Sequence, residues 1–214
     1  MKNRNETIIA PSILGIEENR LFEELGLARG KFYVVYAGNL GKVQGVDVIL
    51  EAAEMLKNKS DIHFVVFGNG SEEENIKKQA EHLTNVSIFP LQSMERVSEV
   101  YSLGDVSIIP CKPGTGGSGM PSKTWTIMAT ATTIIASFDL GGEMERTIKE
   151  AGCGCCVQAG DAKALADAIV RLKNDPETVK TMGKNGRRFA EEQVAKEQAV
   201  QKYIEIIEET VRAR

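Results

Sequence analysis

A glycine-rich loop is followed closely by a lysine near the middle of this 214-residue chain. These residue types, in this order, could bind an anion. The loop glycines are Gly114, Gly116, Gly117 and Gly119. A helix is predicted from Pro121, because the first helical position tolerates the missing N–H of proline. A helix N-terminus behind such a loop exposes N–H groups and about half a positive charge, which attract phosphate. Lys123 would add a full charge in the first turn, so we predict an anion-binding site here.

Two further glycine-bearing loops could bind the same anion, and one carries a second lysine. They are Gly38-Asn39-Leu40-Gly41-Lys42 and Gly68-Asn69-Gly70-Ser71. Each follows an apolar segment of strand length. A single turn glycine is more often required by backbone conformation than by a ligand, so the combination matters more than any one loop. Ligands of parallel sheets bind beyond the carboxyl ends of the strands, so we expect the three loops at one edge.

The elements that would position these loops alternate regularly along the chain. Apolar segments rich in β-branched residues predict strands at 32–38, 62–68, 86–90, 106–110, 134–138 and 154–158. Apolar residues at helical spacing predict helices at 46–57, 72–82, 95–103, 121–131 and 143–150. Apolar strands separated by helices indicate a parallel sheet covered on both faces. We therefore predict an α/β fold, a doubly wound parallel sheet of about six strands.

Both ends of the chain are predicted to be helical. Residues 1–30 are predicted to form an entry segment that adds no core layer, with a short helix at 17–25. Beyond Asp161, a good N-cap, closing helices are predicted at 161–174, 176–193 and 195–213. The last helix carries an apolar stripe, which must cover an apolar surface.

Composition excludes several classes of protein. A net charge of −4 and a pI near 5.4 disfavour a nucleic-acid binder, which needs a basic face. No apolar run approaches the roughly 20 residues of a membrane helix, and residues 1–13 lack the apolar core of a signal peptide. We therefore expect a cytoplasmic protein, with a membrane-peripheral position left open for a longer chain.

The cysteines and aromatic residues favour packing roles. Cys155 and Cys156 are neighbours in a predicted strand and point to opposite faces, so they cannot easily share a metal with Cys153. We expect buried free thiols and no metal site. His63 lies in an apolar strand as a core residue, and Trp125 is expected to pack a helix against the core.

The glycine loop also permits a dinucleotide-binding interpretation. Residues 114–119 match G-x-G-x-x-G, and Asp139 follows Gly119 by 20 residues, the spacing of that fingerprint. The fingerprint is expected in the first strand-to-helix turn of its unit, whereas here three predicted strands precede it. A nicotinamide-dependent oxidoreductase remains an alternative.

Four segments together resemble a known family over nearly the whole chain. They are YAGNLGKVQGVDVILEAAEML, FVVFGNG, SGMPSKTWTIMA and TIKEAGCGCCVQAGDAKALADAI. The combination resembles the C-terminal, nucleotide-sugar-binding half of a GT-B glycosyltransferase of family 4. The resemblance implies a retaining, metal-independent transfer from a nucleotide-sugar donor, UDP-linked by preference, in glycan or polysaccharide synthesis, with no cofactor.

The resemblance also implies a domain division. It makes residues 31–192 the nucleotide-sugar-binding, Rossmann-like domain. The acceptor-binding domain would precede residue 1 and is a missing partner of this chain. Residues 193–214 would pack back on the domain or towards that partner, and the isolated chain would be inactive.

Site residues follow from the same resemblance. The donor diphosphate would be held by Gly38, Asn39, Gly41, Lys42, Ser118, Gly119, Met120, Pro121, Ser122 and Lys123. The base and ribose would lie near Gly68, Pro90, Leu91 and Thr126. No catalytic residue is assigned.

The chain departs from the family pattern at several of these positions. The family's paired glutamates, in an E-x7-E pattern, fall on Ser118 and Thr126. Gly-x-Pro before the next strand is replaced by Ala131-Thr132-Thr133. The family commonly has two basic residues in the first loop, and this chain has Asn39 and Gln44 at those positions. Lys42 is then the basic residue that would substitute for them. The missing glutamates favour a second alternative, a non-catalytic sugar-nucleotide-binding or docking module.

Overall fold

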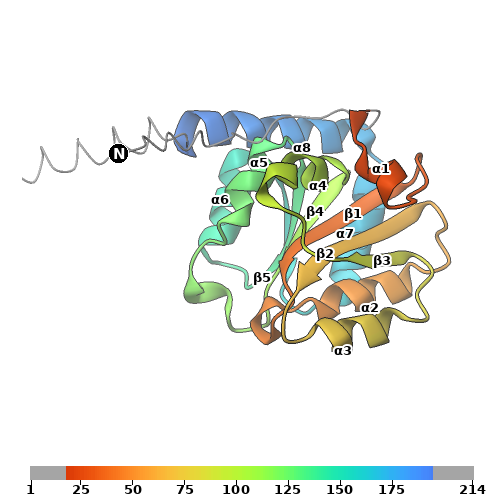
Figure 1. Ribbon diagram of the computed structural model, residues 1–214. Helices are drawn as coiled ribbons and strands as arrows, with labels where there is room; N and C mark the ends of the chain where they lie inside the picture. The colour runs from red at the N-terminus through yellow and green to blue at the C-terminus, as the bar shows by residue number, and fades with distance from the viewer. Residues whose placement is uncertain (1–17, 195–214) are drawn as a thin grey trace, which may run out of the picture.

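The computed structural model describes residues 18–194, and it contains one parallel sheet of six strands in the order β3-β2-β1-β4-β5-β6 (Figure 1). The strands are β1 Phe32–Asn39, β2 Ile62–Asn69, β3 Val86–Phe89, β4 Val106–Pro110, β5 Thr133–Phe138 and β6 Gly154–Gln158. Every pairing is parallel. The predicted α/β fold is confirmed, and each predicted strand boundary lies within one residue of the observed one.

Helices cover both faces of the sheet, as the apolar strands require. One core cluster packs β1, β2 and β4 against α2 Asp47–Met55 and α7 Ala162–Lys173. The other packs the opposite face against α4 Val97–Ser102, α5 Lys123–Ala129 and α6 Glu143–Ala151. The short helix α3, Glu73–Ala80, contributes Ile76 to the first cluster.

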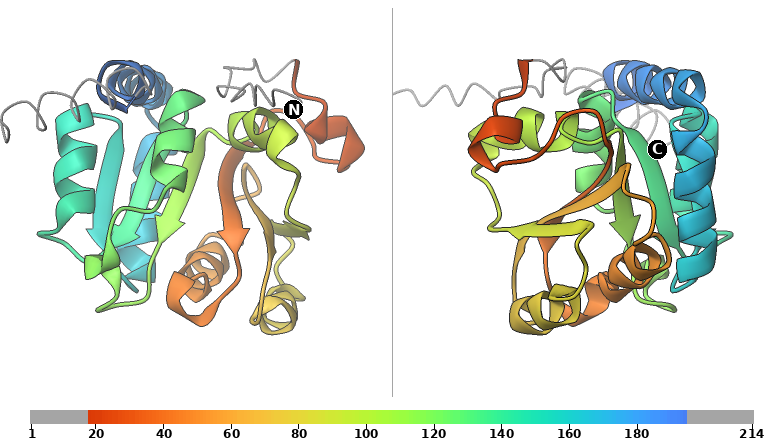
Figure 2. Two further views of the ribbon diagram at one scale, coloured as in Figure 1. Left: turned by 60° about the vertical axis from the view of Figure 1, so that its left-hand side comes forward. Right: turned by 90° about the vertical axis from the view of Figure 1, so that its right-hand side faces the viewer.

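The strand order reverses at β1, which pairs with β2 on one side and β4 on the other. Figure 2 shows the strand arrows pointing the same way in its left view, so the loops after the strands gather at one edge. A reversal of this kind opens a crevice beyond the carboxyl ends of the strands, where doubly wound sheets bind ligands. The loops after β1 and β4 flank that crevice.

The entry segment contributes to the core, contrary to the expectation from the sequence. Helix α1 is limited to Leu21–Glu24, and the side chains of Leu21 and Phe22 are buried. The Phe22 ring meets Tyr33 of β1 edge to face at 5.2 Å between centroids. Apolar residues at helical spacing predicted the helix at 17–25, but they carried no information on the contact with β1 that buries it.

The C-terminal helices begin as predicted. Asp161 accepts a hydrogen bond from the Ala164 amide at 2.8 Å and caps α7. Asp175 does the same for Thr178 at 3.0 Å and caps α8, Pro176–Phe189, which crosses the top of the domain in Figure 1. The helix predicted at 195–213 lies outside the described residues. Within residues 18–194, no helix is long and apolar enough to cross a membrane.

The turn between α5 and β5 holds a strained residue. Ala131 has φ of 56°, in the left-handed region that costs a residue with a Cβ about 1–2 kcal/mol. Its carbonyl oxygen lies so close to Gly183 of α8 that a side chain at Gly183 would collide with it. The family that the sequence resembles has glycine where this chain has Ala131, which fits the conformation of the turn.

Ala131→Gly should therefore stabilise the fold. Relief of the strain exceeds the roughly 0.4–1 kcal/mol of extra unfolded-state entropy that glycine brings, for a net gain of about 0.5–1 kcal/mol in the free energy of unfolding. Urea denaturation of both proteins measures the difference. The control is Ala129→Gly in the last turn of α5, which should lose about 1 kcal/mol. Equal losses for both variants would show that the turn carries no strain.

Candidate functional site

A pocket of about 240 Å³ lies beyond the end of β1, at the reversal of strand order. Its walls come from the end of β1, the loop after β3, helix α4 and the first turns of α5. The lining residues are Ala37, Gly38, Leu91, Gln92, Ser93, Met94, Val97, Val100, Tyr101, Ser122, Lys123 and Thr126.

Among the described residues that line the pocket, the cation is the ammonium of Lys123. Lys123 is the first residue of α5, and its Nζ lies 4.4 Å from the centroid of the Tyr36 ring. The ammonium also lies against Gly38, where any side chain would collide with it. Burial lowers the pKa of Lys123 to about 8. No carboxylate of the described residues pairs with this ammonium, and burial makes it a desolvated charge that an anionic ligand would satisfy.

The wall on the other side of the pocket is apolar. Leu91 and Met94 lie at the rim with 47% and 80% of their surface exposed, and Val97 and Val100 of α4 lie deeper. Large apolar side chains left this exposed at a pocket rim indicate a surface that a ligand can cover. The pocket is therefore suited to a molecule with an anionic part at Lys123 and a flat or apolar part against the α4 side.

Hydroxyl groups complete the polar side of the pocket. Ser122 and Thr126 line it from α5, and Tyr101 lines it from α4. Burial raises the pKa of Tyr101 to about 12, so its phenol stays neutral and can donate a hydrogen bond. Thr126 lies one helical turn from Lys123, on the same face of α5.

The structure brings together five of the residues named from the sequence. Gly38, Leu91, Ser122, Lys123 and Thr126 line this one pocket. Three others, Gly119, Met120 and Pro121, line a neighbouring cavity of about 390 Å³. Asn39, Gly41, Gly68 and Pro90 line neither of these cavities. The Ser118 side chain lies outside the described positions.

The two lysines expected at one diphosphate face different cavities. Lys42 lines a third cavity of about 360 Å³, together with Lys112, Asp47 and Glu72. It belongs to a short turn, Lys42–Gln44, on the side of β1 that carries α2. Lys42 therefore lies at the predicted edge of the sheet but lines a different cavity from Lys123.

Gly68 has a packing role in this structure. It pairs with Gly38 across β1 and β2, and a side chain there would collide with the Gly38 carbonyl oxygen and with Leu40. Glycine is needed for this close approach of two strands, without any ligand.

The amides of the glycine-rich loop bind a carboxylate of the protein itself, the side chain of Asp139. The Asp139 carboxylate accepts hydrogen bonds from the amides of Gly114 and Gly116 at 3.1 and 2.9 Å. These backbone hydrogen bonds, that of Gly114 first, lower the pKa of Asp139. The amides predicted to bind a phosphate therefore bind the Asp139 carboxylate, which ties the loop to the end of β5. Asp139, which the dinucleotide interpretation would place on a ribose, makes this internal contact in the structure.

The sequence-based search missed most of the α4 wall. Gln92, Ser93, Met94, Val97, Val100 and Tyr101 line the pocket but were not named as site residues. The signal that could have found them is the position of residues 91–94, which directly follow a predicted strand at the ligand-binding edge.

Residues that were expected to pack do so. Cys153 is buried, and Cys155 and Cys156 are half-buried free thiols. Burial raises the pKa of Cys153 and of Cys156 to about 12, so both stay protonated. Trp125 packs against the second core cluster. His63 is buried, with Nε2 2.9 Å from the Ser87 hydroxyl, and burial lowers its pKa to about 4. Among residues 18–194, no three His, Cys, Asp or Glu side chains are placed to hold a metal ion.

Comparison with known families identifies the class of protein to which this fold and pocket belong. Residues 17–189 match the model of the glycosyl transferases group 1. The chain therefore belongs to the group 1 glycosyltransferases.

Relatives and solved structures agree with this family. The chain is 28% identical over 189 residues to WcaI of Escherichia coli K12, a glycosyl transferase whose name assigns it to colanic acid biosynthesis. That match covers 86% of this chain and 45% of WcaI, so the chain spans about half the length of this relative. The C-terminal domain of the group 1 protein LpcC from Francisella tularensis matches with a TM-score of 0.66 and 18% identity, covering 88% of this chain and 96% of that domain. HepE of Anabaena, solved in complex with UDP-glucose, matches with a TM-score of 0.76 and 15% identity, covering 96% of this chain and 55% of HepE.

Lys123→Met should stabilise the fold at pH 7. The unfolded chain holds the lysine proton with the ordinary pKa of 10.5 and the folded chain with one of about 8. The folded state therefore carries the full penalty of the buried charge below pH 8, and stability rises with pH between these values. Removal of the charge should gain on the order of 1–2 kcal/mol at pH 7, after loss of the contact with Tyr36.

Urea denaturation at pH 7 and pH 10 measures this effect. The gain should shrink towards pH 10, where the lysine is neutral in the folded wild type. The control is Lys42→Met, which removes an exposed lysine on the neighbouring loop and should change stability little at pH 7. A loss of stability in Lys123→Met that is the same at both pH values would show that the ammonium is not desolvated.

Proposed function

We propose that the chain is the donor-binding domain of a retaining, metal-independent glycosyltransferase that uses a UDP-sugar in glycan or polysaccharide synthesis. The observation that carries the proposal is the buried Lys123 ammonium, which has no carboxylate partner among the described residues and faces a pocket at the carboxyl end of β1. Family membership supports the reaction class. The complex of HepE with UDP-glucose supports the donor.

The two sides of the pocket match the two parts of a nucleotide diphosphate. The diphosphate is placed at Lys123, whose positive charge gains from an anion in a desolvated site. The base is placed against Leu91, Met94 and Val97, where an aromatic ring covers apolar surface. Thr126 is the candidate for the ribose, with one hydroxyl in place of the carboxylate of the family pattern.

Sugar transfer from such a donor leaves a negative charge on the departing diphosphate. A fixed positive charge close to the leaving oxygen stabilises that charge as it develops. Lys123 is packed against the ring of Tyr36 and against Gly38, and these contacts limit the reorganisation of its side chain during the reaction. The remaining parts of the reaction, contacts to the acceptor and closure of the cleft, are assigned to a second domain outside this chain.

The second candidate function is a sugar-nucleotide-binding or docking module without activity. The replacement of the paired glutamates by Ser118 and Thr126 favours it, because a threonine cannot accept two charge-assisted hydrogen bonds. Both candidates require donor binding in the same pocket. They differ in whether a supplied acceptor domain restores sugar transfer.

Lys123→Met should weaken the binding of UDP much more than the binding of uridine. A hydrogen bond to a charged group contributes about 1.5–3 kcal/mol, or roughly ten- to hundredfold in affinity, and uridine carries no phosphate. Calorimetric titration of UDP, UDP-glucose, uridine and NAD against the wild type and the variant measures this. We expect UDP to bind more tightly than NAD.

The control is again Lys42→Met, which should change UDP affinity less than Lys123→Met because Lys42 faces another cavity. Equal weakening of UDP and uridine by Lys123→Met would remove the lysine from the phosphate site. Tighter binding of NAD than of UDP would favour the oxidoreductase alternative.

A further inference from the structure

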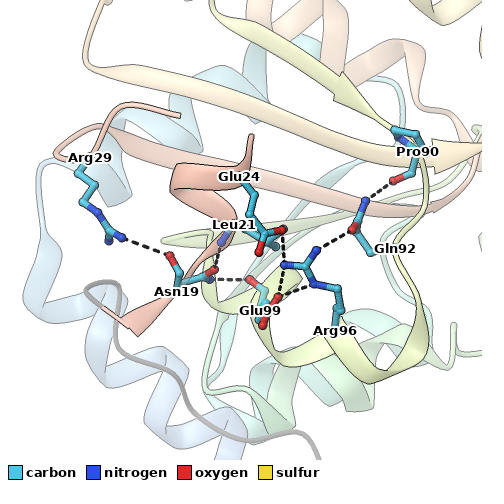
Figure 3. Close-up of polar contacts among 8 residues, drawn as sticks. All are labelled: Asn19, Leu21, Glu24, Arg29, Pro90, Gln92, Arg96 and Glu99. Carbon is cyan, nitrogen blue, oxygen red and sulfur yellow. Dashed lines mark hydrogen bonds and ion pairs between the residues drawn. The ribbon is translucent and has the colours of Figure 1, made fainter. Parts of the chain in front are cut away.

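Arg96 joins three segments of the chain next to the pocket. It ends the short turn Met94–Arg96, which leads from the pocket loop into α4. Its Nε lies 2.6 Å from the Oε2 of Glu99, its Nη2 lies 2.8 Å from the Oε2 of Glu24, and its Nη1 lies 3.5 Å from the Oε1 of Gln92 (Figure 3). The guanidinium therefore connects α4, the entry segment and the loop after β3.

The loop partner, Gln92, is held at both ends of its amide. Its Oε1 accepts from Arg96, and its Nε2 donates to the Pro90 carbonyl oxygen at 3.0 Å. The backbone amide of Arg96 also donates to the Ser93 carbonyl oxygen at 3.0 Å. Residues 90–93 are thus tied to Arg96 by a side-chain and a main-chain contact. This loop carries Leu91, which lies at the apolar rim of the pocket.

The entry segment reaches the same junction by a second route. Asn19 is fully buried, donates from Nδ2 to the Glu99 carbonyl oxygen at 2.6 Å and accepts from the Leu21 amide at 3.0 Å (Figure 3). Glu24 adds the ion pair with Arg96. Residues 19–24 therefore lie against α4 through a buried amide and a half-exposed ion pair.

We propose that Arg96 is a positioning residue that holds the apolar wall of the pocket at the spacing a nucleobase needs, and that Glu24 orients it from the entry segment. The inference rests on the proposed function, since it places the base against residues 91–94. Arginine suits this role because its planar guanidinium offers five N–H donors in a fixed fork spread over three nitrogens, whereas the three donors of a lysine all leave from one atom. Nothing else described in the loop ties it to both α4 and the entry segment.

The test compares a ligand that carries a base with one that does not. Calorimetric titration of UDP and of inorganic pyrophosphate is carried out on the whole chain, as wild type and as the variants Arg96→Met, Arg96→Lys, Gln92→Ala and Glu24→Gln. We expect Arg96→Met to weaken UDP binding by about three- to tenfold and to leave pyrophosphate binding within about twofold. Arg96→Lys should fail to restore UDP affinity, and Glu24→Gln should give a smaller loss of the same kind.

A double variant tests whether the effect passes through the loop. If Arg96 acts on the base through Gln92, Arg96→Met combined with Gln92→Ala should lose no more UDP affinity than the larger single effect. Gln92→Ala leaves both ion pairs of Arg96 in place, so it tests the positioning of the loop even if Arg96→Met does not fold. Loss of UDP affinity in Gln92→Ala with pyrophosphate unchanged would then support the proposal.

The control variant is Lys173→Met, which removes a half-buried cation that pairs with Asp61 at the other end of the sheet. It should lower stability, measured by thermal unfolding, without changing UDP affinity. Equal weakening of UDP and pyrophosphate in Arg96→Met, or no change in either, would overturn the role of Arg96 while leaving the proposed function standing. Failure of the wild type to bind UDP at all would overturn both.

Discussion

The ammonium of Lys123 is buried between the Tyr36 ring and the backbone at Gly38, and much of the site follows from how that charge is held. Burial of a charged group is unfavourable unless a partner compensates for it. The aromatic ring supplies part of the compensation. The end of β1 comes close to the charge, and a side chain at Gly38, whose φ is 154°, would have to displace the ammonium. The strand order then matters, because the reversal at β1 opens the space into which the lysine points.

The two anion-binding features of the chain have separate roles. The glycine loop after β4 uses its amides to bind Asp139, and this internal contact fixes the loop between β4 and α5 to the end of β5. The lysine at the start of α5 is left without such a partner in the described residues. The amides of Gly114 and Gly116 that bind this structural anion, and the lysine proposed to bind an external one, thus lie on one strand-loop-helix unit, at residues 114, 116 and 123.

The fold could be predicted from the sequence because its signals are local. The apolar segments predicted each strand boundary to within one residue, and Asp161 marked the start of α7. The resemblance to the family led us to expect Ser122, Lys123 and Thr126 close together on one helix, and they lie at the start of α5.

The parts that could not be predicted depend on contacts between distant residues. Asp139 reaches amides 23 and 25 residues away, and nothing in the spacing distinguishes that contact from a ribose contact. The separation of Lys42 from Lys123 depends on which side of β1 each loop turns to. Arg96 forms an ion pair with Glu24, which lies 72 residues earlier in the chain, and a single sequence carries no signal for such a pair.

The most direct test of the site is a titration of the isotopically labelled chain with UDP, followed by the backbone amide resonances in two-dimensional NMR. Binding in the pocket predicts that the largest shift changes fall on Gly38, on residues 91–94 and on residues 122–126. The amides of Gly114 and Gly116, which Asp139 occupies, should change little. Large changes at Gly114 and Gly116 with none at Gly38 and Lys123 would place the nucleotide on the glycine loop and contradict the assignment of the donor site.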